Sequence, residues 1–214
     1  MRKLFRVKVC GITNWTDARL ALDAGADALG FNFCRASPRY VSPAKAQRII
    51  RRLPKEAVVV GVFVNRSPAD VARIARMLRL DFVQLHGEES AKDVADLARS
   101  HRVIRALRVA PRFRLAALRE FPGVAAFLLD GHLRKARGGT GRSFNWQIAR
   151  RAARFGPIIL AGGLDPENVA RAIRIARPTA VDVASGVEAR PGKKDPALVR
   201  AFLEEVSKAH REMR

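Results

Sequence analysis

The sequence predicts an α/β protein, a single (β/α)₈ TIM barrel whose eight parallel strands form a closed sheet within residues 1–214. Short apolar segments alternate with amphipathic segments from one end of the chain to the other, and there are eight such pairs. No G-x-G-x-x-G turn follows the first apolar segment, which argues against an open dinucleotide-binding sheet. The 214 residues, 48% of them hydrophobic, suffice for one well-buried core and would be cramped as two domains.

The expected strands are short apolar runs, because parallel strands in such a fold are buried on both faces. Their length and their spacing by amphipathic segments fit strands better than buried helices. We place them at residues 6–12, 28–33, 57–64, 82–87, 102–109, 125–131, 157–163 and 180–186.

Several amphipathic segments begin at residues that cap helices. Ser, Thr, Asn and Asp side chains accept hydrogen bonds from the first free N–H groups of a helix, and proline suits the first helical turn. The expected starts are Asn14 or Thr16, the pairs Ser67-Pro68 and Asp165-Pro166, and Asp195 for the last helix.

The charge is strongly positive, with 41 Lys and Arg against 20 Asp and Glu and a formal net charge of +21. Such a field attracts nucleic acid, anionic lipid or small anionic substrates. The basic residues are spread over many expected helices instead of forming one dense run, so we expect them mainly to solvate helix surfaces. We do not expect a nucleic-acid-binding protein, although nucleic-acid contact stays open as a secondary property.

Neither a membrane segment nor a metal site is expected. No apolar run approaches the roughly 20 residues that span a bilayer, and the N-terminus leads directly into a strand-like segment. We therefore expect a cytoplasmic protein without membrane association. Cys10 and Cys34 are too few for a disulfide framework and match no common zinc spacing, so any role they have is as thiols, and we treat Cys34 as incidental.

Cys10 ends the first expected strand, at the edge of a barrel where active sites are built. It is either a small buried side chain or a thiolate base. The two-residue alternation of a strand places Lys8 on the same side, inside the barrel, and Asp182 of the last strand also faces inward. Our hypothesis is that Lys8 and Asp182 pair across the seam beneath Cys10 and that the lysine favours the thiolate; otherwise one of them reaches solvent.

Three further side chains follow strands at the same edge. Asp130 is either a cap or loop anchor, or a catalytic acid whose pKa burial raises. His86 is either a structural histidine or a substrate contact. Arg39, in a loop restrained by two prolines, could clamp a carboxylate or lie solvated. The loops at 34–42 and 132–143 are long enough to be binding loops, and the second is glycine-rich and cationic.

Glycine turns end the last two expected strands, at Gly162-Gly163 and at Ser185-Gly186. Backbone N–H groups in such turns, together with a helix N-terminus, form a phosphate cradle, and the phosphate site of many barrels follows strands seven and eight. The alternative is a pair of ordinary tight turns. We expect these residues to bind a phosphorylated small-molecule substrate, and we count His86 and Asp182 among its contacts.

The order of these motifs resembles the phosphoribosylanthranilate isomerase family along nearly the whole chain. Each motif is short, but their joint order is specific. They are KVCGIT (8–13), ADALGFNF (26–33), SPRYVSP (37–43), VGVFVN (60–65), VQLHG (83–87), GGTG (138–141), FNW (144–146), LAGGLDPENV (160–169), VDVASGVE (181–188) and PGKKD (191–195).

The resemblance implies an Amadori rearrangement of N-(5′-phosphoribosyl)anthranilate to 1-(2-carboxyphenylamino)-1-deoxyribulose 5-phosphate in tryptophan biosynthesis, with no metal or organic cofactor. Asp130 matches the acid that opens the furanose ring to a Schiff base. Cys10 matches the base that removes the proton from the second ribose carbon. Arg39 matches the group that faces the anthranilate carboxylate. Gly162, Gly163, Ser185 and Gly186 match the phosphate turns.

Two other interpretations remain at this stage. A related sugar-phosphate isomerase of the histidine pathway, or a dual-substrate enzyme, would need a second phosphate site, and only one clear pair of glycine turns is present. A catalytically inactive barrel that binds polyanions would show salt-dependent nucleic-acid binding without isomerase activity. For any of these we expect a monomer or a homodimer.

Overall fold

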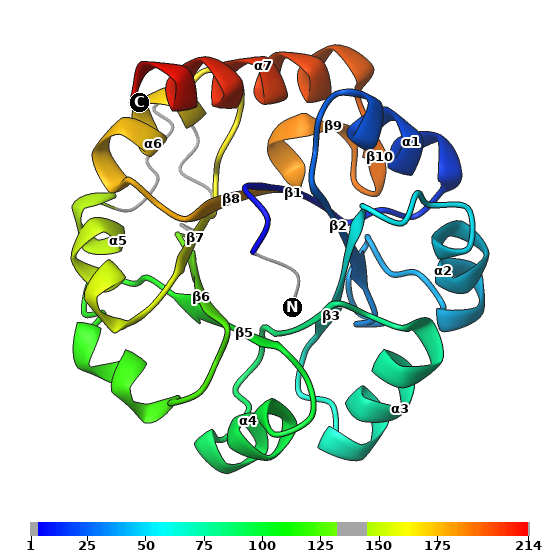
Figure 1. The fold of residues 1–214 in the computed structure, drawn as a ribbon, viewed down its shortest axis with the longest axis vertical. Helices are drawn as coiled ribbons and strands as arrows, with labels where there is room; N and C mark the ends of the chain where they lie inside the picture. The colour runs from blue at the N-terminus through cyan, green and yellow to red at the C-terminus, as the bar shows by residue number, and fades with distance from the viewer. Residues whose placement is uncertain (1–3, 132–144, 214) are drawn as a thin grey trace.

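The computed structural model describes residues 4–131 and 145–213, and their eight main strands form a closed parallel barrel in sequence order (Figure 1). Every strand lies within its expected range, so the predicted closed barrel is confirmed. The strands are β1 (Val7–Cys10), β2 (Ala28–Asn32), β3 (Val58–Phe63), β4 (Phe82–Leu85), β5 (Val103–Arg108), β6 (Ala126–Asp130), β7 (Ile158–Ala161) and β8 (Ala180–Val183).

Helices surround the barrel and follow each strand (Figure 1). One differs from the expected pattern: after β5 the chain forms the short 3₁₀ helix η1 (Leu115–Glu120). It ends before Phe121, where the following Pro122 disfavours helical geometry. The remaining helices are α1 (Trp15–Asp23), α2 (Pro43–Ile50), α3 (Pro68–Leu78), α4 (Ala91–Ala98), α5 (Gln147–Ala152), η2 (Ala153–Phe155), α6 (Val169–Ala176), η3 (Ser185–Val187) and α7 (Pro196–Glu212).

Three of the expected helix caps are confirmed. The side chains of Asn14, Ser67 and Asp195 accept hydrogen bonds from backbone N–H groups in the first turns of α1, α3 and α7. Thr16 lies inside α1 and caps nothing.

The expected start of α6 at Asp165-Pro166 is wrong. The Asp165 carboxylate accepts hydrogen bonds from the backbone N–H groups of Glu167 and Asn168, at 2.9 and 3.0 Å. This side chain therefore stabilises a turn, and α6 begins three residues later than Pro166, at Val169.

A small hairpin that the sequence did not predict lies between β8 and α7. Its strands, β9 (Glu188–Arg190) and β10 (Lys193–Lys194), pair antiparallel, and Figure 1 shows them beside α1. The hairpin sits on the side of the barrel where β1 and β8 close the sheet.

An ion pair lies inside the barrel among apolar side chains. Lys8 and Asp182 are paired in the register of β1 and β8, and Lys8 Nζ lies 2.7 Å from Asp182 Oδ1. The Lys8 side chain is fully buried. The predicted pair across the seam is confirmed, and it satisfies a lysine that would otherwise be costly to bury.

Gly30 of β2 provides the space for this arrangement. It is the register partner of Cys10, and a Cβ atom at Gly30 would lie 2.7 Å from Cys10 Sγ and 3.0 Å from Lys8 Cε. A side chain at this position would displace the thiol or the lysine, because both point to the same interior space.

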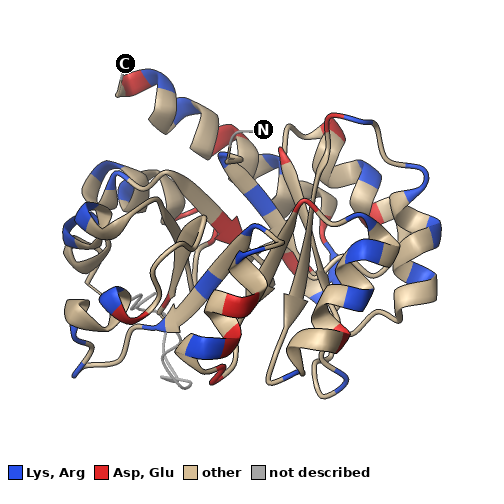
Figure 2. Cartoon of the chain, turned by 60° about the horizontal axis from the view of Figure 1, so that its bottom comes forward, with Lys and Arg blue, Asp and Glu red and all other residues tan. Residues whose placement is uncertain are grey.

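Positive charge is distributed over the outer surface. Figure 2 shows Lys and Arg on many helices and loops of the barrel instead of in one block. Within residues 4–131 and 145–213, no helix combines the length and apolar character needed to cross a membrane.

We predict that Lys8→Met destabilises the fold by about 3–5 kcal/mol, because it leaves the Asp182 carboxylate buried without its partner. Urea unfolding followed by circular dichroism measures the change. Arg174→Met is the matched control, since it breaks an ion pair with Glu212 whose side chains are 50% and 55% exposed, and such pairs contribute about 1 kcal/mol or less. Equal losses in the two variants would contradict a stabilising role for the buried pair.

Candidate active site

A cavity of about 380 Å³ lies at the carboxyl ends of the strands. Residues of β1, β2, β3, β4, β6, β7 and β8 and of the loops that follow them line it, so it brings together segments from both ends of the chain. Its lining includes the predicted site residues Cys10, Arg39, His86, Asp130, Gly162, Gly163, Asp182 and Ser185. Cys34, which we treated as incidental, is not part of it.

Cys10 ends β1 and lines this cavity, two residues beyond Lys8. Burial raises the pKa of the Cys10 thiol, while the Lys8 and Lys194 ammonium groups act in the opposite direction without overcoming it. Lys8 thus favours the thiolate, as expected, but burial outweighs its effect and leaves the pKa of Cys10 raised. The Asp182 carboxylate, which is paired with Lys8, adds to the effect of burial and also raises the pKa of Cys10.

Lys8 itself stays protonated. Burial lowers the pKa of Lys8, but the pairing with Asp182 and the proximity of Cys10 outweigh burial and raise it. The cavity therefore has a permanent cation beneath its thiol, neutralised by Asp182.

Asp130 ends β6 and belongs to a chain of side chains that crosses the cavity. Its Oδ2 lies 3.2 Å from His86 Nε2, and the other ring nitrogen of His86, Nδ1, lies 3.0 Å from Gln84 Nε2. Since an amide nitrogen donates, Nδ1 of His86 accepts and Nε2 carries the hydrogen that points to Asp130. Gln84 is fully buried, so its hydrogen bond to Nδ1 holds the His86 ring in this orientation.

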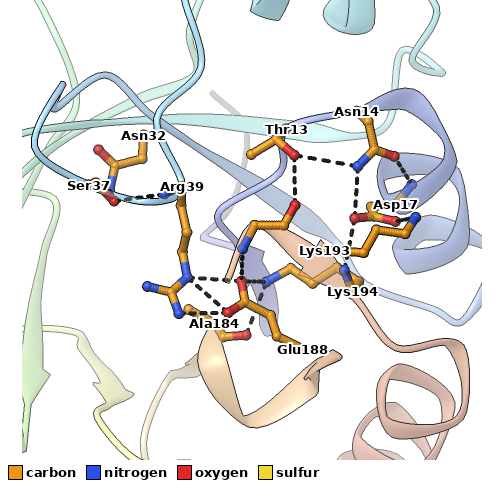
Figure 3. A network of polar contacts seen from close by, with 11 residues as sticks. Thr13, Asn14, Asp17, Asn32, Ser37, Arg39, Ala184, Glu188, Lys193 and Lys194 are labelled. Carbon is orange, nitrogen blue, oxygen red and sulfur yellow. Dashed lines mark hydrogen bonds and ion pairs between the residues drawn. The ribbon is translucent and has the colours of Figure 1, made fainter. Parts of the chain in front are cut away.

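Arg39 reaches the cavity from the loop between β2 and α2. The loop is ordered by Ser37, whose Oγ accepts from the Arg39 backbone N–H at 3.1 Å and from Asn32 Nδ2 at 3.2 Å. The guanidinium forms two parallel contacts with Glu188, from Nε to Oε1 at 2.9 Å and from Nη2 to Oε2 at 2.6 Å (Figure 3). These hydrogen bonds raise the pKa of Arg39.

The two glycine turns pack against each other beside Asp130. Gly162 and Gly163 have φ of +80° and +71°, the left-handed region that glycine adopts without strain. A Cβ atom at Gly162 would also lie 2.5 Å from Asp130 Oδ1. Gly186 is the one predicted site residue outside the cavity lining: a Cβ there would collide with the carbonyl oxygen of Leu164, so this glycine lets the turn after β8 approach the turn after β7.

The sequence did not identify four polar residues of the site: Asn32, Gln84, Glu188 and Lys194. Gln84 interrupts an apolar strand, a signal that could have marked it. Glu188 and Lys194 fall in the motifs VDVASGVE and PGKKD, but they meet only in the folded chain. The loop at 132–143 lies outside the described residues. Among the residues that are described, no cluster of His, Cys, Asp and Glu could hold a metal ion.

Fold and cavity together define a (β/α)₈-barrel enzyme with a thiol, a carboxyl group and two glycine turns around one cavity. Comparison with known proteins gives the family. Residues 7–205 match the family described as N-(5′phosphoribosyl)anthranilate (PRA) isomerase, and the chain belongs to this family.

Individual relatives agree with this assignment. The chain is 52% identical over 200 residues to the N-(5′-phosphoribosyl)anthranilate isomerase of Pelobacter propionicus, covering 94% of each. Among solved structures, a phosphoribosyl anthranilate isomerase from Thermotoga maritima superposes with a TM-score of 0.85 at 42% identity, over 96% of this chain and 100% of that one. A phosphoribosyl anthranilate isomerase in complex with reduced 1-(o-carboxyphenylamino)-1-deoxyribulose 5-phosphate has the same TM-score at 40% identity and the same coverage.

We predict that Cys10 reacts slowly with iodoacetamide at neutral pH and faster as the pH rises through the alkaline range. The thiolate is the reactive form, and a raised pKa moves its appearance to higher pH. The rate is measured by mass spectrometry in a Cys34→Ala background, where Cys10 is the single thiol, with free cysteine as the reference. A rate already at its plateau at neutral pH would show that the thiolate prevails.

Proposed function

We propose that the protein catalyses the Amadori rearrangement of N-(5′-phosphoribosyl)anthranilate to 1-(2-carboxyphenylamino)-1-deoxyribulose 5-phosphate, with Asp130 as the acid and Cys10 as the base. The observation that carries this proposal is that both side chains line one cavity together with the glycine turns after β7 and β8. The relatives' names supply the substrate, and the solved complex with a reduced product shows that a protein of this fold binds such a molecule.

Substrate placement follows from the two ends of the cavity. The phosphate would bind at the turns of Gly162, Gly163, Ser185 and Gly186, where backbone N–H groups and the start of a helix favour an anion. The anthranilate carboxylate would face Arg39, whose guanidinium borders the same cavity. The ribose then lies between Cys10 and Asp130.

Ring opening is the first chemical step. Asp130 protonates the furanose ring oxygen, the bond from this oxygen to the first ribose carbon breaks, and the nitrogen lone pair forms the Schiff base. The transferred proton is the one that the Asp130 carboxyl group carries in its acid form, and His86, whose Nε2 lies 3.2 Å from Asp130 Oδ2, holds that group in place. His86 thus orients the acid and serves as a substrate neighbour.

Removal of the proton from the second ribose carbon is the next step. The Cys10 thiolate takes this proton, the electrons move toward the cationic nitrogen, and the resulting enolamine tautomerises to the ketone. Burial raises the pKa of Cys10, so the thiol form is favoured before the Schiff base forms. The positive charge of the Schiff base favours the thiolate, which places ring opening before proton removal.

Because the acid and the base lie on different strands, β6 and β1, each has its own surroundings, and these set the pKa of each group separately. Cys10 lies above the pair of Lys8 and Asp182, whereas Asp130 contacts the imidazole of His86. The cytoplasmic location and the monomeric or homodimeric state expected from the sequence stay predictions.

We predict that Cys10→Ala and Asp130→Asn each lower turnover about 10²- to 10⁴-fold, the usual contribution of one proton-transfer group. The loss of phosphoribosylanthranilate fluorescence measures the rate. Cys34→Ala is the control, because its thiol does not line the cavity, and it should retain wild-type turnover. Wild-type rates in both Cys10→Ala and Asp130→Asn would refute the assigned roles.

A further inference from the structure

A buried network joins the hairpin of β9 and β10 to the wall of the cavity (Figure 3). Its centre is the carboxylate of Glu188, which is only 3% exposed. Besides the two parallel contacts from Arg39, this carboxylate accepts from Lys194 Nζ at 3.0 Å and from the Gly192 backbone N–H at 3.3 Å. We name Arg39, Glu188 and Lys194 the hairpin cluster.

Lys194 is fully buried although it carries an ammonium group. Its Nζ also donates to the carbonyl oxygen of Ala184, at 3.0 Å, immediately after β8. Burial lowers the pKa of Lys194, and Glu188 opposes this change. Lys194 therefore holds Glu188 against the end of β8.

The hairpin is fixed to α1 and to the loop that leads from β1 into α1. Asp17 of α1 is buried and accepts from Lys193 Nζ at 2.6 Å and from the Lys194 backbone N–H at 2.9 Å. Thr13 Oγ1 donates to the Gly192 carbonyl oxygen at 2.7 Å. Glu188 is thus held on a rigid support, as a positioning group must be.

One nitrogen of the Arg39 guanidinium, Nη1, is not used by the contact with Glu188. Nε and Nη2 are engaged by Glu188, whereas no hydrogen bond joins Nη1 to another residue that the structure describes. Figure 3 shows this third nitrogen pointing away from Glu188. The aliphatic part of the Arg39 side chain packs directly against Gly11. A Cβ atom at Gly11 would lie only 2.6 Å from Arg39 Cδ. The side chain remains 22% exposed.

Charge in the hairpin cluster is unbalanced. Two cations, Arg39 and Lys194, share one carboxylate, so one positive charge is left over. The exposed part of the cluster is Arg39, which lines the same cavity as Cys10. A ligand carboxylate at Nη1 would neutralise this charge and meet a guanidinium that is already oriented.

We propose that Glu188, held by Lys194, is a positioning residue that aims the Arg39 guanidinium at the substrate and so determines selectivity for an arylamine with an ortho carboxylate. This inference rests on the proposed function. Without Glu188, the long Arg39 side chain would sample several rotamers, and part of its interaction with the carboxylate would be lost in ordering it.

The test compares two substrates that differ only in the carboxylate. One is N-(5′-phosphoribosyl)anthranilate, and the other is the same adduct made from aniline. Selectivity is the ratio of their kcat/KM values. Glu188→Gln should lower this ratio at least about 10-fold, since displacement of a positioning group by about 1 Å costs up to about 100-fold. The kcat/KM for the aniline adduct should change by less than about 3-fold.

Two controls separate positioning from a general structural effect. Glu212→Gln makes the same change in an exposed pair with Arg174 and should leave the ratio unaltered. In the double variant Arg39→Met/Glu188→Gln, the ratio should equal that of Arg39→Met alone, because Glu188 acts through Arg39. If Glu188→Gln fails to fold, Glu188→Asp replaces it: the charge is kept for Lys194, the reach to Arg39 is shortened, and the ratio should still fall.

The outcomes distinguish this inference from the proposed function. A wild-type protein that converts neither compound would refute the proposed function itself. A wild-type protein that prefers the anthranilate adduct, with an unchanged ratio in the Glu188 variant or equal losses on both compounds, would overturn the positioning role alone.

Discussion

The seam at which β8 meets β1 is the contact on which the site depends. Its register sets Lys8 against Asp182 inside the barrel, and their side chains pair at 2.7 Å. Two charged side chains can be buried beneath Cys10 only because they are paired with each other. Either Lys8 or Asp182 alone would be costly to bury. The same closure brings the turn after β8 and the β9–β10 hairpin to the end of β1, although they lie far apart in the sequence.

Charge around the cavity follows from this arrangement. Three cations, Lys8, Arg39 and Lys194, form ion pairs with two carboxylates, Asp182 and Glu188. These five groups near the end of β1 therefore carry one net positive charge. A substrate with a phosphate and a carboxylate complements such a surface. The cations lower the pKa of the Cys10 thiol, but burial outweighs them and raises it. In the proposed reaction, the positive charge of the Schiff base supplies the additional electrostatic stabilisation of the Cys10 thiolate.

Local patterns were sufficient for the fold and for much of the site. Apolar runs located all eight barrel strands, and two-residue alternation placed Lys8 and Asp182 on the same interior face. Cys10 and Asp130 were marked by their positions at strand ends. The contact of Arg39 with Glu188 could not be predicted, because it joins residues 149 positions apart through a hairpin with no clear strand pattern. The net protonation of Cys10 also depends on burial, which no sequence pattern quantifies.

The most direct test of the central claim is a crystal structure of this protein with reduced 1-(o-carboxyphenylamino)-1-deoxyribulose 5-phosphate. The account predicts the phosphate at the turns of Gly162 and Ser185, and Cys10 Sγ within about 3.5 Å of the second sugar carbon, the separation of a reactive pair. It also predicts the Asp130 carboxyl group on the opposite side of the sugar. A ligand phosphate bound elsewhere, or a sugar that contacts only one of these two side chains, would contradict the account.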